Sequence, residues 1–506
     1  MEKTVLTFLP GDPGKRFEWI AYQNGRVAGL CDGQFCFSCN YDERKKLEGF
    51  DGGKLEVVLQ QQLKTGPFGI KREFFLAHLV SVPQSQPEKM EIGLRAVEGA
   101  AEIEFEPTFN TILYLSGQDK ILVDPGSMLM NGSKAELIKL ITAYRPNIVI
   151  ITHGHQDHWR NLELLDIEEG VIIYLTPLAY RLILYTAKME KNTVLQRVLK
   201  KCQIINPGDR INLGKAKIYT FGVPHTIPES MGLLIISDKK RVVHLCDFRL
   251  GEGVEKAELV TSLRAIAREK VNLLVANIVN AHQENNTTES MVINSLTDIL
   301  TEAEGRVIVT CFSTNLERIG NIAEIGQAQG RKVFFLGAGM KRAREELSRE
   351  GLEFEVEDEG DILSDYSLIF VSGCQAEPNS VLQQIIRGEN LYFEPRSSDV
   401  LVSSARCIPG NEEALRQQYI DLRPKFERVV LNEGEIKRLR IEDLGVEEAL
   451  THNSGHAYKK EISSVVNILE PETVFPVPQV GDGFEAFKTM VERKRIKMIK
   501  ERVVEL

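Results

Sequence analysis

Short apolar runs, many of them β-branched, recur along the chain and are separated by polar turns. In residues 1–92 these runs are bounded by Gly, Pro and Asp, which predicts a small β-rich domain. From residue 93 onward, helical stretches join the strand-like runs. Between residues 255 and 448 the two kinds of segment alternate, which predicts a parallel α/β sheet. The pattern therefore predicts an α/β protein with more than one domain.

One apolar run leads directly into a dense group of ionisable side chains. Residues 147–152 form a short β-branched segment, and His153, His155, Asp157 and His158 follow it. Alternate residues of an extended segment point the same way, and a turn brings the last two side chains toward the same point. Neutral imidazoles and an anionic oxygen suit Zn²⁺ or Mn²⁺. A histidine-rich surface loop is the alternative, but the position directly behind a buried strand favours a metal site.

Composition narrows the compartment and the partners. The 506 residues include 62 Lys and Arg against 72 Asp and Glu, which gives a formal net charge of -10. This balance excludes a uniformly basic nucleic-acid coat but permits a local basic channel. Eight cysteines are scattered along the chain, and no apolar run approaches the roughly 20 residues of a membrane helix. We therefore expect a cytoplasmic protein without disulfides or a membrane partner.

The cysteines at positions 31, 36 and 39 form a C-x4-C-x2-C cluster. Its spacing is compatible with iron–sulfur or zinc ligation, but a fourth ligand is missing nearby. Small buried cysteines in a β-rich domain are therefore favoured.

The segment Thr152–His158, of sequence THGHQDH, resembles the signature loop of the metallo-β-lactamase superfamily. This resemblance implies an αββα sandwich with metals at one edge, a fold that hosts many different substrates. Other segments resemble the ribonuclease J branch of the beta-CASP nucleases. Those segments read PHTIPES, HLCDF, PGDRINLG, TTES, TCFSTNLER, SGCQAEP, IPGNE and HNSGHA.

The resemblance also implies a division of the chain. An N-terminal β-rich domain of unknown role is expected at residues 1–92, and the first part of the metallo-β-lactamase core at 93–254. A beta-CASP α/β domain is expected as an insertion at 255–448. The second part of the core is expected at 449–506, ending in a basic helix that includes residues 493–500.

The same resemblance implies one or two Zn²⁺ ions, with Mn²⁺ as an alternative. The expected ligands lie in the segment Thr152–His158, the metal loop, and after two later strands. They are His153, His155, Asp157, His158, His225 and Asp247. His153, His155 and His225 would hold one metal. Asp157 and His158 would hold the second. Asp247 would bridge the two. Asp124, after an earlier strand, would support the loop from behind, and a turn-forming aspartate is the alternative.

Further residues are expected to act on the substrate. Asp157, His456 and Glu289 are the candidate catalytic residues, and Glu289 matches the family's acidic motif. An imidazole at the position of His456 can contact the scissile phosphate or protonate the leaving oxygen, and a core or capping histidine is the alternative. Turns that contain Gly and Ser offer donors to phosphate oxygens, although such residues often serve only the turn. The phosphate-binding candidates are Ser372, Gly373, Gln375, Ser454 and Gly455.

One departure from the family concerns the second metal. The family ends its last core strand in Pro-Val-His-Gly, whereas this chain has Pro-Val-Pro-Gln, with Pro478 at the position of the last ligating histidine. Proline cannot ligate through its ring nitrogen, so water, substrate phosphate, Gln479 or Asp482 would have to substitute. The carboxy-terminal domain that ribonuclease J uses for assembly is expected to be absent, so an oligomer would need another interface.

These observations predict a metal-dependent nuclease that cleaves RNA, with single-stranded RNA favoured, by means of a metal-activated water. A DNA nuclease of the same fold is one alternative. A catalytically weakened RNA-binding or scaffold protein is the other, because of Pro478. Six intact ligands argue against a scaffold, which has no chemical need for them. RNA is preferred to DNA by resemblance alone, since no residue identifies readout of the 2′-hydroxyl.

Overall fold

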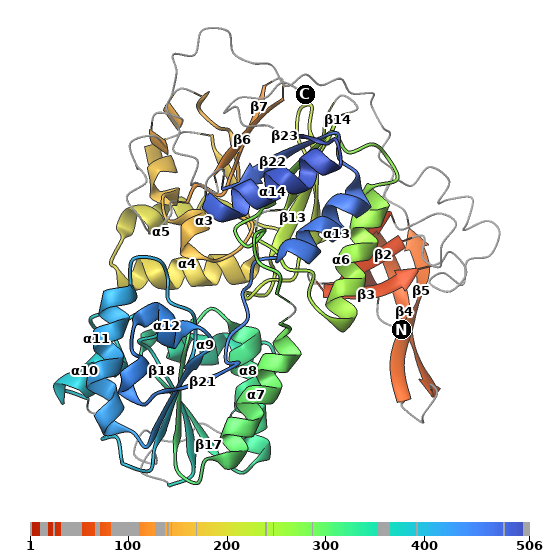
Figure 1. Ribbon diagram of the computed structural model, residues 1–506. Coiled ribbons are helices and arrows are strands. Elements are labelled where there is room, and N and C mark those ends of the chain that lie inside the picture. Colours follow the sequence, from red (N-terminus) through yellow and green to blue (C-terminus); the bar gives the residue numbers. More distant parts are fainter. Residues whose placement is uncertain are drawn as a thin grey trace. The chain divides into compact units, whose positions relative to one another are not determined.

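The computed structural model describes two parts of the chain. Before residue 82 it gives the backbone of five strands. It then describes residues 111–498, apart from residues 117, 127–136, 139–140, 143, 168–169, 238–239, 246, 286, 353, 355–364, 391–392 and 479–480. The chain divides into two compact units. The first comprises Met1–His225, Glu229–Asn285 and Gly455–Leu506, and the second comprises Thr226–Pro228 and Asn286–Ser454. Figure 1 labels their helices and strands.

Two β-sheets form the framework of the first unit. One is ordered β10-β9-β8-β7-β6, with β6 antiparallel to β7 and the others parallel. Its strands are β6 (Ile112–Ser116), β7 (Asp119–Val123), β8 (Ile148–Ile150), β9 (Ile172–Leu175) and β10 (Cys202–Ile204). The other is ordered β11-β12-β13-β14-β15-β22-β23, antiparallel up to β14 and parallel after it. Its strands are β11 (Arg210–Asn212), β12 (Lys217–Gly222), β13 (Met231–Ser237), β14 (Lys240–Leu245), β15 (Leu273–Asn277), β22 (Thr473–Val477) and β23 (Lys497–Met498).

The alternation along β7 shows why the two sheets pack face to face. Ile121 and Val123 belong to the apolar cluster between the sheets, whereas Leu122 belongs to the cluster beneath the helices of the outer face. A strand segment buried on both faces has a continuous apolar sequence, and residues 121–123 of β7 form one. The helical elements on this side are α3 (Gln156–Trp159), η1 (Leu162–Ile167), α4 (Pro177–Met189) and α5 (Thr193–Leu199).

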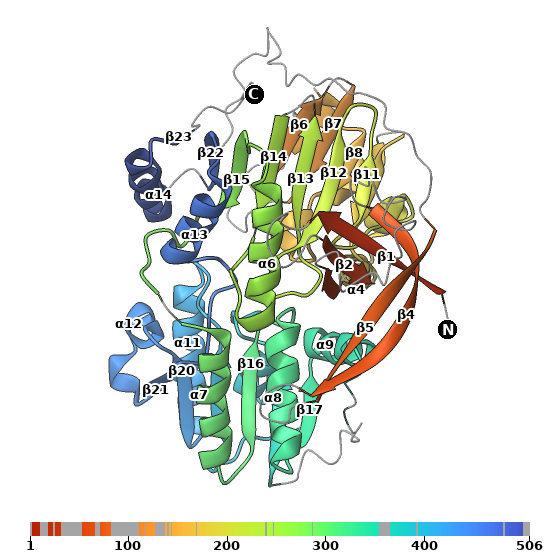
Figure 2. The same ribbon diagram turned by 90° about the vertical axis from the view of Figure 1, so that its right-hand side faces the viewer.

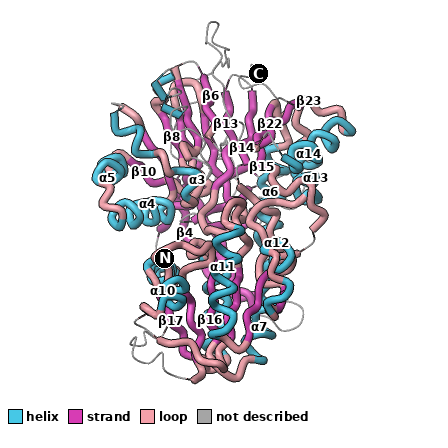
Figure 3. The backbone as a smooth tube through the Cα atoms, turned by 60° about the vertical axis from the view of Figure 1, so that its left-hand side comes forward, coloured by secondary structure: helices cyan, strands magenta, loops and turns pink. Residues whose placement is uncertain are grey.

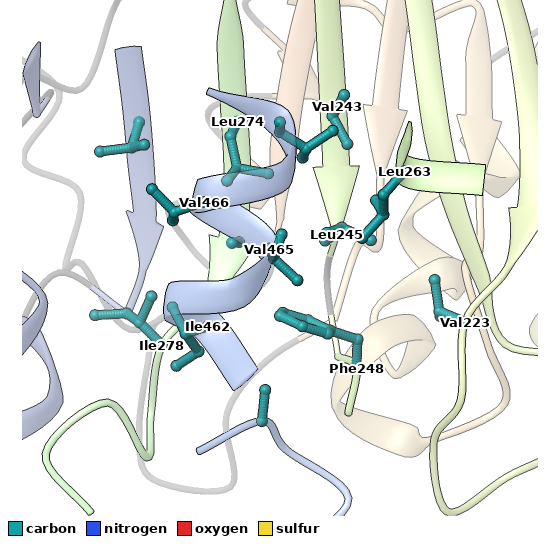
Figure 4. Close-up of a cluster of buried hydrophobic side chains, with 14 of the residues drawn as sticks. Val223, Val243, Leu245, Phe248, Leu263, Leu274, Ile278, Ile462, Val465 and Val466 are labelled. Atoms are coloured by element: carbon teal, nitrogen blue, oxygen red, sulfur yellow. The ribbon is translucent and has the colours of Figure 1, made fainter. Parts of the chain in front are cut away.

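The second sheet is covered in the same way on its own outer face (Figures 2 and 3). Its helices are α6 (Gly253–Ile266), α13 (Lys459–Leu469) and α14 (Gly481–Arg493). Figure 4 shows part of this cluster, in which Val465 and Val466 of α13 lie among Leu245 of β14, Leu274 of β15 and Leu263 of α6. The first unit is therefore the expected helix–sheet–sheet–helix sandwich.

In the second unit, helices surround one parallel sheet, as the alternating sequence pattern predicted. The strand order is β17-β18-β16-β19-β20-β21, and every pair is parallel. The strands are β16 (Val307–Cys311), β17 (Lys332–Leu336), β18 (Ser367–Val371), β19 (Val400–Ser404), β20 (Arg428–Asn432) and β21 (Glu447–Ala449). Apolar residues of α10 (Val381–Arg387), α11 (Glu412–Leu422) and α12 (Glu435–Leu439) pack on one face. On the other face α7 (Glu289–Glu302) and α8 (Leu316–Ala328) lie together, and α9 (Ala338–Arg349) follows β17 (Figure 1).

The N-terminal region contains a five-stranded antiparallel sheet ordered β3-β2-β1-β4-β5, in agreement with the predicted β-rich character. Its strands are β1 (Lys3–Pro10), β2 (Trp19–Gln23), β3 (Arg26–Cys31), β4 (Gly53–Thr65) and β5 (Lys71–Ser81). Cys36 and Cys39 lie outside the described residues. In the part of the chain that is described, no helix is long and apolar enough to cross a membrane.

Two boundaries differ from those expected. We placed the start of the inserted domain at residue 255, but β15 pairs with β14 and β22 in the sheet of the first unit, so residues up to Asn285 belong there. The basic helix was also extended too far. The helix α14 ends at Arg493, and Arg495 has a φ of 57°, which is incompatible with continuing an α-helix. Lys497 then pairs with β22 as part of β23.

The packing of α6 generates a stability prediction. Leu263 is fully buried in the cluster of Figure 4, whereas Val254 of the same helix is 72% exposed. Leu263→Ala should lower the free energy of unfolding of the first unit by about 2–5 kcal/mol, because it leaves a cavity. Val254→Ala should change it by less than about 0.5 kcal/mol. Urea unfolding followed by tryptophan fluorescence measures both, and equal losses would contradict the packing described.

Candidate metal centre

The metal loop is held from behind by one carboxylate. Asp124 follows β7, is completely buried and has a φ of 51°, an uncommon conformation for a residue other than glycine. Its oxygens accept hydrogen bonds from the backbone N–H of Thr152 at 2.8 Å and from the Thr152 hydroxyl at 2.7 Å. One of them also lies 2.8 Å from Nδ1 of His158. Asp124 therefore ties the start of the loop to its last histidine, the supporting position expected for it.

A glycine brings the two segments into contact. A Cβ atom on Gly126 would lie 1.6 Å from the carbonyl oxygen of Asp157, so only glycine allows this approach. The loop then turns into α3 at Gln156, which places Asp157 and His158 in the first turn of that helix.

Three imidazoles direct one nitrogen each toward a common point. Nδ1 of His155 lies 3.0 Å from Nε2 of His153 and 3.1 Å from Nε2 of His225. Oδ2 of Asp247 lies 3.8 Å and 3.7 Å from the latter two nitrogens. Nitrogens bound to a tetrahedral zinc at ~2.0–2.1 Å are separated by roughly 3.3 Å, which is close to the spacing found here. These four residues form one candidate ligand group.

A second candidate group shares a carboxylate with the first. Oδ2 of Asp247 lies 3.2 Å from Nε2 of His158, and that nitrogen lies 3.4 Å from Oδ2 of Asp157. Asp157, His158 and Asp247 form this group. The same Asp247 oxygen thus faces both sets of histidines, as a bridging ligand must.

The protonation of the cluster suits a cation. Burial and the neighbouring imidazoles hold the pKa of His153 and His225 well below the ordinary value, and burial lowers the pKa of His155 to about 4. These three rings are therefore neutral at pH 7 and can offer lone pairs. Burial opposes the charging of His158, but the surrounding aspartates, Asp157 first, hold its pKa well above the usual range. The aspartates around His158 carry negative charge that a bound cation can neutralise.

The outer ring nitrogens are fixed by partners of their own. Nδ1 of His153 lies 3.1 Å from the Thr152 hydroxyl oxygen, and Nδ1 of His225 lies 2.8 Å from the carbonyl oxygen of Gly455. Such contacts orient a histidine so that its other nitrogen faces the centre. The carbonyl of Gly455 thus positions His225, and the phosphate contact expected of its N–H group stays a prediction.

The ring of His456 lies at the side of the cluster. Its centroid is 5.5 Å from that of His225, and its Nδ1 is 3.6 Å from Oδ1 of Asp247. The side chain is 32% exposed, whereas the side chains of His153, His158 and His225 are at most 1% exposed. His456 is therefore brought to the metal centre together with the expected ligands, while its ring can still meet an incoming molecule.

Sequence reasoning missed residues that support the cluster. Nδ2 of Asn277, at the end of β15, donates to Oδ1 of Asp247 at 2.7 Å. His244 of β14 is buried behind the cluster with its Nδ1 2.7 Å from the Tyr114 hydroxyl. A polar residue at the end of an apolar strand was the available signal for Asn277, the same signal that identified Asp247.

Glu289 has a different environment from the one expected. It is 6% exposed, and its two oxygens accept hydrogen bonds from Arg318 Nε at 2.6 Å and Nη2 at 2.7 Å. Arg318 also donates to Nδ1 of His452 at 2.9 Å and to the carbonyl oxygen of Asn453 at 3.2 Å. Both carboxylate oxygens are thus engaged in a buried ion pair, which argues against the catalytic role expected of Glu289.

The phosphate-binding candidates of the second unit mainly support their own loops. Nε2 of Gln375 donates to the carbonyl oxygen of Arg406, and its Oε1 accepts from the backbone of Ile408. The hydroxyl oxygen of Ser372 accepts from the backbone of Val381 at the start of α10. Gly373 has a φ of 126°, a conformation that favours glycine. These contacts give Gln375 a structural task instead of the expected phosphate contact, and Ser454 is half-buried in the histidine motif.

Pro478 lies directly after β22, at the position where a last ligating histidine was expected. Val477 before it pairs with Asn277 of β15. Neither Pro478 nor the exposed Asp482 belongs to the ligand groups found among the described residues, and Gln479 lies outside them. The second group therefore consists of three protein residues in the part of the chain that is described.

Comparison with known families agrees with this fold. Residues 119–283 match the beta-lactamase superfamily domain, and residues 304–422 match the beta-CASP domain of ribonuclease J. The chain therefore carries a beta-lactamase superfamily domain and a beta-CASP domain. The predicted fold class is confirmed, and so is the predicted similarity to the beta-lactamase superfamily and, in the second domain, to the beta-CASP domain of ribonuclease J.

Individual relatives lead to the same family. Ribonuclease J of Sinorhizobium meliloti is 33% identical over 67% of this chain and 59% of the relative. Ribonuclease J of Mycoplasma pneumoniae is 27% identical over 65% of this chain and 57% of the relative. The chain thus spans less than two thirds of the length of these relatives. A crystal structure of a protein of unknown function from Enterococcus faecalis V583 has a TM-score of 0.53 at 14% identity, covering 79% of this chain and 98% of that one, which shows a shared fold.

The residues present suit the divalent metal that the superfamily implies. Imidazoles and carboxylates are the donors that such cations prefer, and they converge here in two groups around one shared oxygen.

The buried Glu289–Arg318 pair yields a second prediction. Glu289→Ala should destabilise the second unit by about 3–5 kcal/mol, because it leaves the fully buried Arg318 without a counter-charge. Glu302→Ala is the matched control, since Glu302 lies in the same helix and its pair with Arg428 is exposed, so its loss should cost at most about 1 kcal/mol. Chemical unfolding of each variant measures the difference. Unchanged stability with lost nuclease activity would instead restore the catalytic assignment.

Proposed function

We propose that this protein is a metal-dependent phosphodiester hydrolase that cleaves RNA. The proposal is supported most directly by the single Asp247 oxygen that faces both ligand groups. Similarity to proteins named ribonuclease J favours RNA as the substrate. Zn²⁺ is the proposed metal because imidazole nitrogens predominate in the first group, and Mn²⁺ is the second choice.

The proposed ligands form two sets, one for each cation. His153, His155 and His225 with Asp247 would hold one cation, and Asp157 and His158 with Asp247 would hold the other. Bound cations supply a water of lowered pKa and neutralise the charge that develops on phosphate. Asp124 keeps the loop in place through Thr152 and His158.

His456 is proposed to act on the substrate itself. Its ring is more exposed than those of His153, His158 and His225 and lies beside Asp247. An imidazole can give a proton to the leaving oxygen or donate a hydrogen bond to the phosphate, provided that it reaches either atom. Ser454, two residues before His456, remains a candidate to donate a hydrogen bond to phosphate.

A second candidate function is RNA binding without cleavage. Pro478 favours it, since the second group then has only three protein ligands among the described residues. Cleavage of DNA is a third outcome that the assay below distinguishes.

Removal of two ligands provides the direct test. The double variant His155→Ala with Asp157→Ala removes one ligand from each group and should reduce cleavage of a single-stranded RNA oligonucleotide to background. Matched RNA and DNA oligonucleotides should be compared on wild-type protein whose metal content per chain has been determined by elemental analysis. The double variant His282→Ala with Asp298→Ala, two exposed residues outside the ligand groups, is the control. Full cleavage by the ligand variant would refute the metal-site assignment, and binding without cleavage by wild type would support the second candidate.

The consequence of Pro478 can be measured separately. Pro478→His places an imidazole after β22 and should tighten the second cation, raising the metal content toward two ions per chain, if the position faces the second group. Calorimetric titration of metal-free protein measures the two affinities. Titration curves identical to those of wild type would mean that the position does not reach the metal.

A further inference from the structure

Asn277 makes a contact that no expected ligand makes. It ends β15, is 6% exposed, and its Nδ2 donates to Oδ1 of Asp247 at 2.7 Å. Its own Oδ1 accepts a hydrogen bond from the backbone N–H of Val279 at 3.0 Å. Because a backbone N–H can only donate, this second contact determines which end of the amide faces Asp247. The amide is thus held with its donor toward the carboxylate.

Because of this contact, the two carboxylate oxygens of Asp247 have different roles. Asn277 engages Oδ1 at 2.7 Å, while Oδ2 lies 3.2 Å from His158 Nε2, 3.7 Å from His225 Nε2 and 3.8 Å from His153 Nε2. A free carboxylate can rotate and exchange its oxygens, and this one is fixed. We propose that Asn277 is a positioning residue that holds Asp247 so that one oxygen serves both cations.

A neutral amide suits this position better than a charged group. Asp247 is a proposed metal ligand, and a carboxylate binds a cation in its anionic form. A second carboxylate at position 277 would repel that anion or share a proton with it. The amide donates a hydrogen bond and leaves the negative charge of Asp247 available to the cations.

The two ligand groups depend on Asp247 to different degrees. The first group keeps three histidines if the carboxylate turns away, whereas the second keeps only Asp157 and His158. Loss of the Asn277 contact should therefore weaken the second cation more than the first. This inference rests on the proposed metal assignment.

The test is cation binding by the full-length chain. Metal-free wild type, Asn277→Ala and Asn277→Leu should be titrated with Mn²⁺, and the number of ions and each Kd determined by calorimetry. Leucine has the same number of side-chain heavy atoms as asparagine and the same branching at Cγ but no N–H group, so it tests the hydrogen bond while the site stays filled. Asn272→Ala is the matched control. Asn272 precedes the other end of β15, is also buried, and binds the backbone of Arg241 without a described contact to Asp247.

Both Asn277 variants should bind the second cation roughly 10–100-fold less tightly than wild type does. This is the usual effect of removing a group that orients a metal ligand. Asn272→Ala should keep wild-type affinities, and melting temperatures with and without Mn²⁺ should show a smaller metal-induced rise only for the Asn277 variants. If Asn277→Leu binds as tightly as wild type, or if Asn272→Ala loses as much affinity, the positioning role is refuted. Failure of wild type to bind any cation would instead overturn the proposed metal centre, and the inference with it.

Discussion

The arrangement of the metal centre depends on the buried carboxylate of Asp124. It accepts hydrogen bonds from the backbone and hydroxyl of Thr152 and contacts His158, so one side chain fixes both ends of the metal loop. A completely buried carboxylate is costly unless its oxygens are paired, and here every described hydrogen bond of the Asp124 carboxylate goes to the loop. The unusual φ of Asp124 and the close approach of Gly126 are consistent with a segment shaped around that contact.

The sandwich explains how residues distant in sequence reach the same point. The loop follows β8 of one sheet, whereas His225, Asp247 and Asn277 follow or end β12, β14 and β15 of the other. Apolar side chains from both sheets fill the space between them, which fixes the positions of the strand ends. The polar residues can then occupy the rim, where packing does not require apolar side chains. Folding of the two sheets therefore already holds the ligands together, and little further conformational entropy is lost when they bind a cation.

Much of this centre could be predicted from the sequence, and the remainder could not for a physical reason. His153, His155, Asp157 and His158 are adjacent in sequence, so local strand geometry was enough to group them. The roles of Gly455 and Asn277 depend on hydrogen bonds to His225 and Asp247 across the fold, and no local pattern encodes such a partner. Glu289 is a different case, and its catalytic role stays a prediction. Its motif indicated an acid, while burial against Arg318 makes it part of an ion pair.

The two ligand groups also differ in what they leave open. Under the proposed assignment the first has four protein ligands, a complete set for tetrahedral zinc, as in closed structural sites. The second has three, and a site with three protein ligands keeps a position for water or substrate, as catalytic zinc sites do. Pro478 then removes a ligand from a cation that must remain accessible in any case. Its expected effect is on the affinity for that cation, and the chemistry itself depends on how firmly Asp247 is held between the two groups.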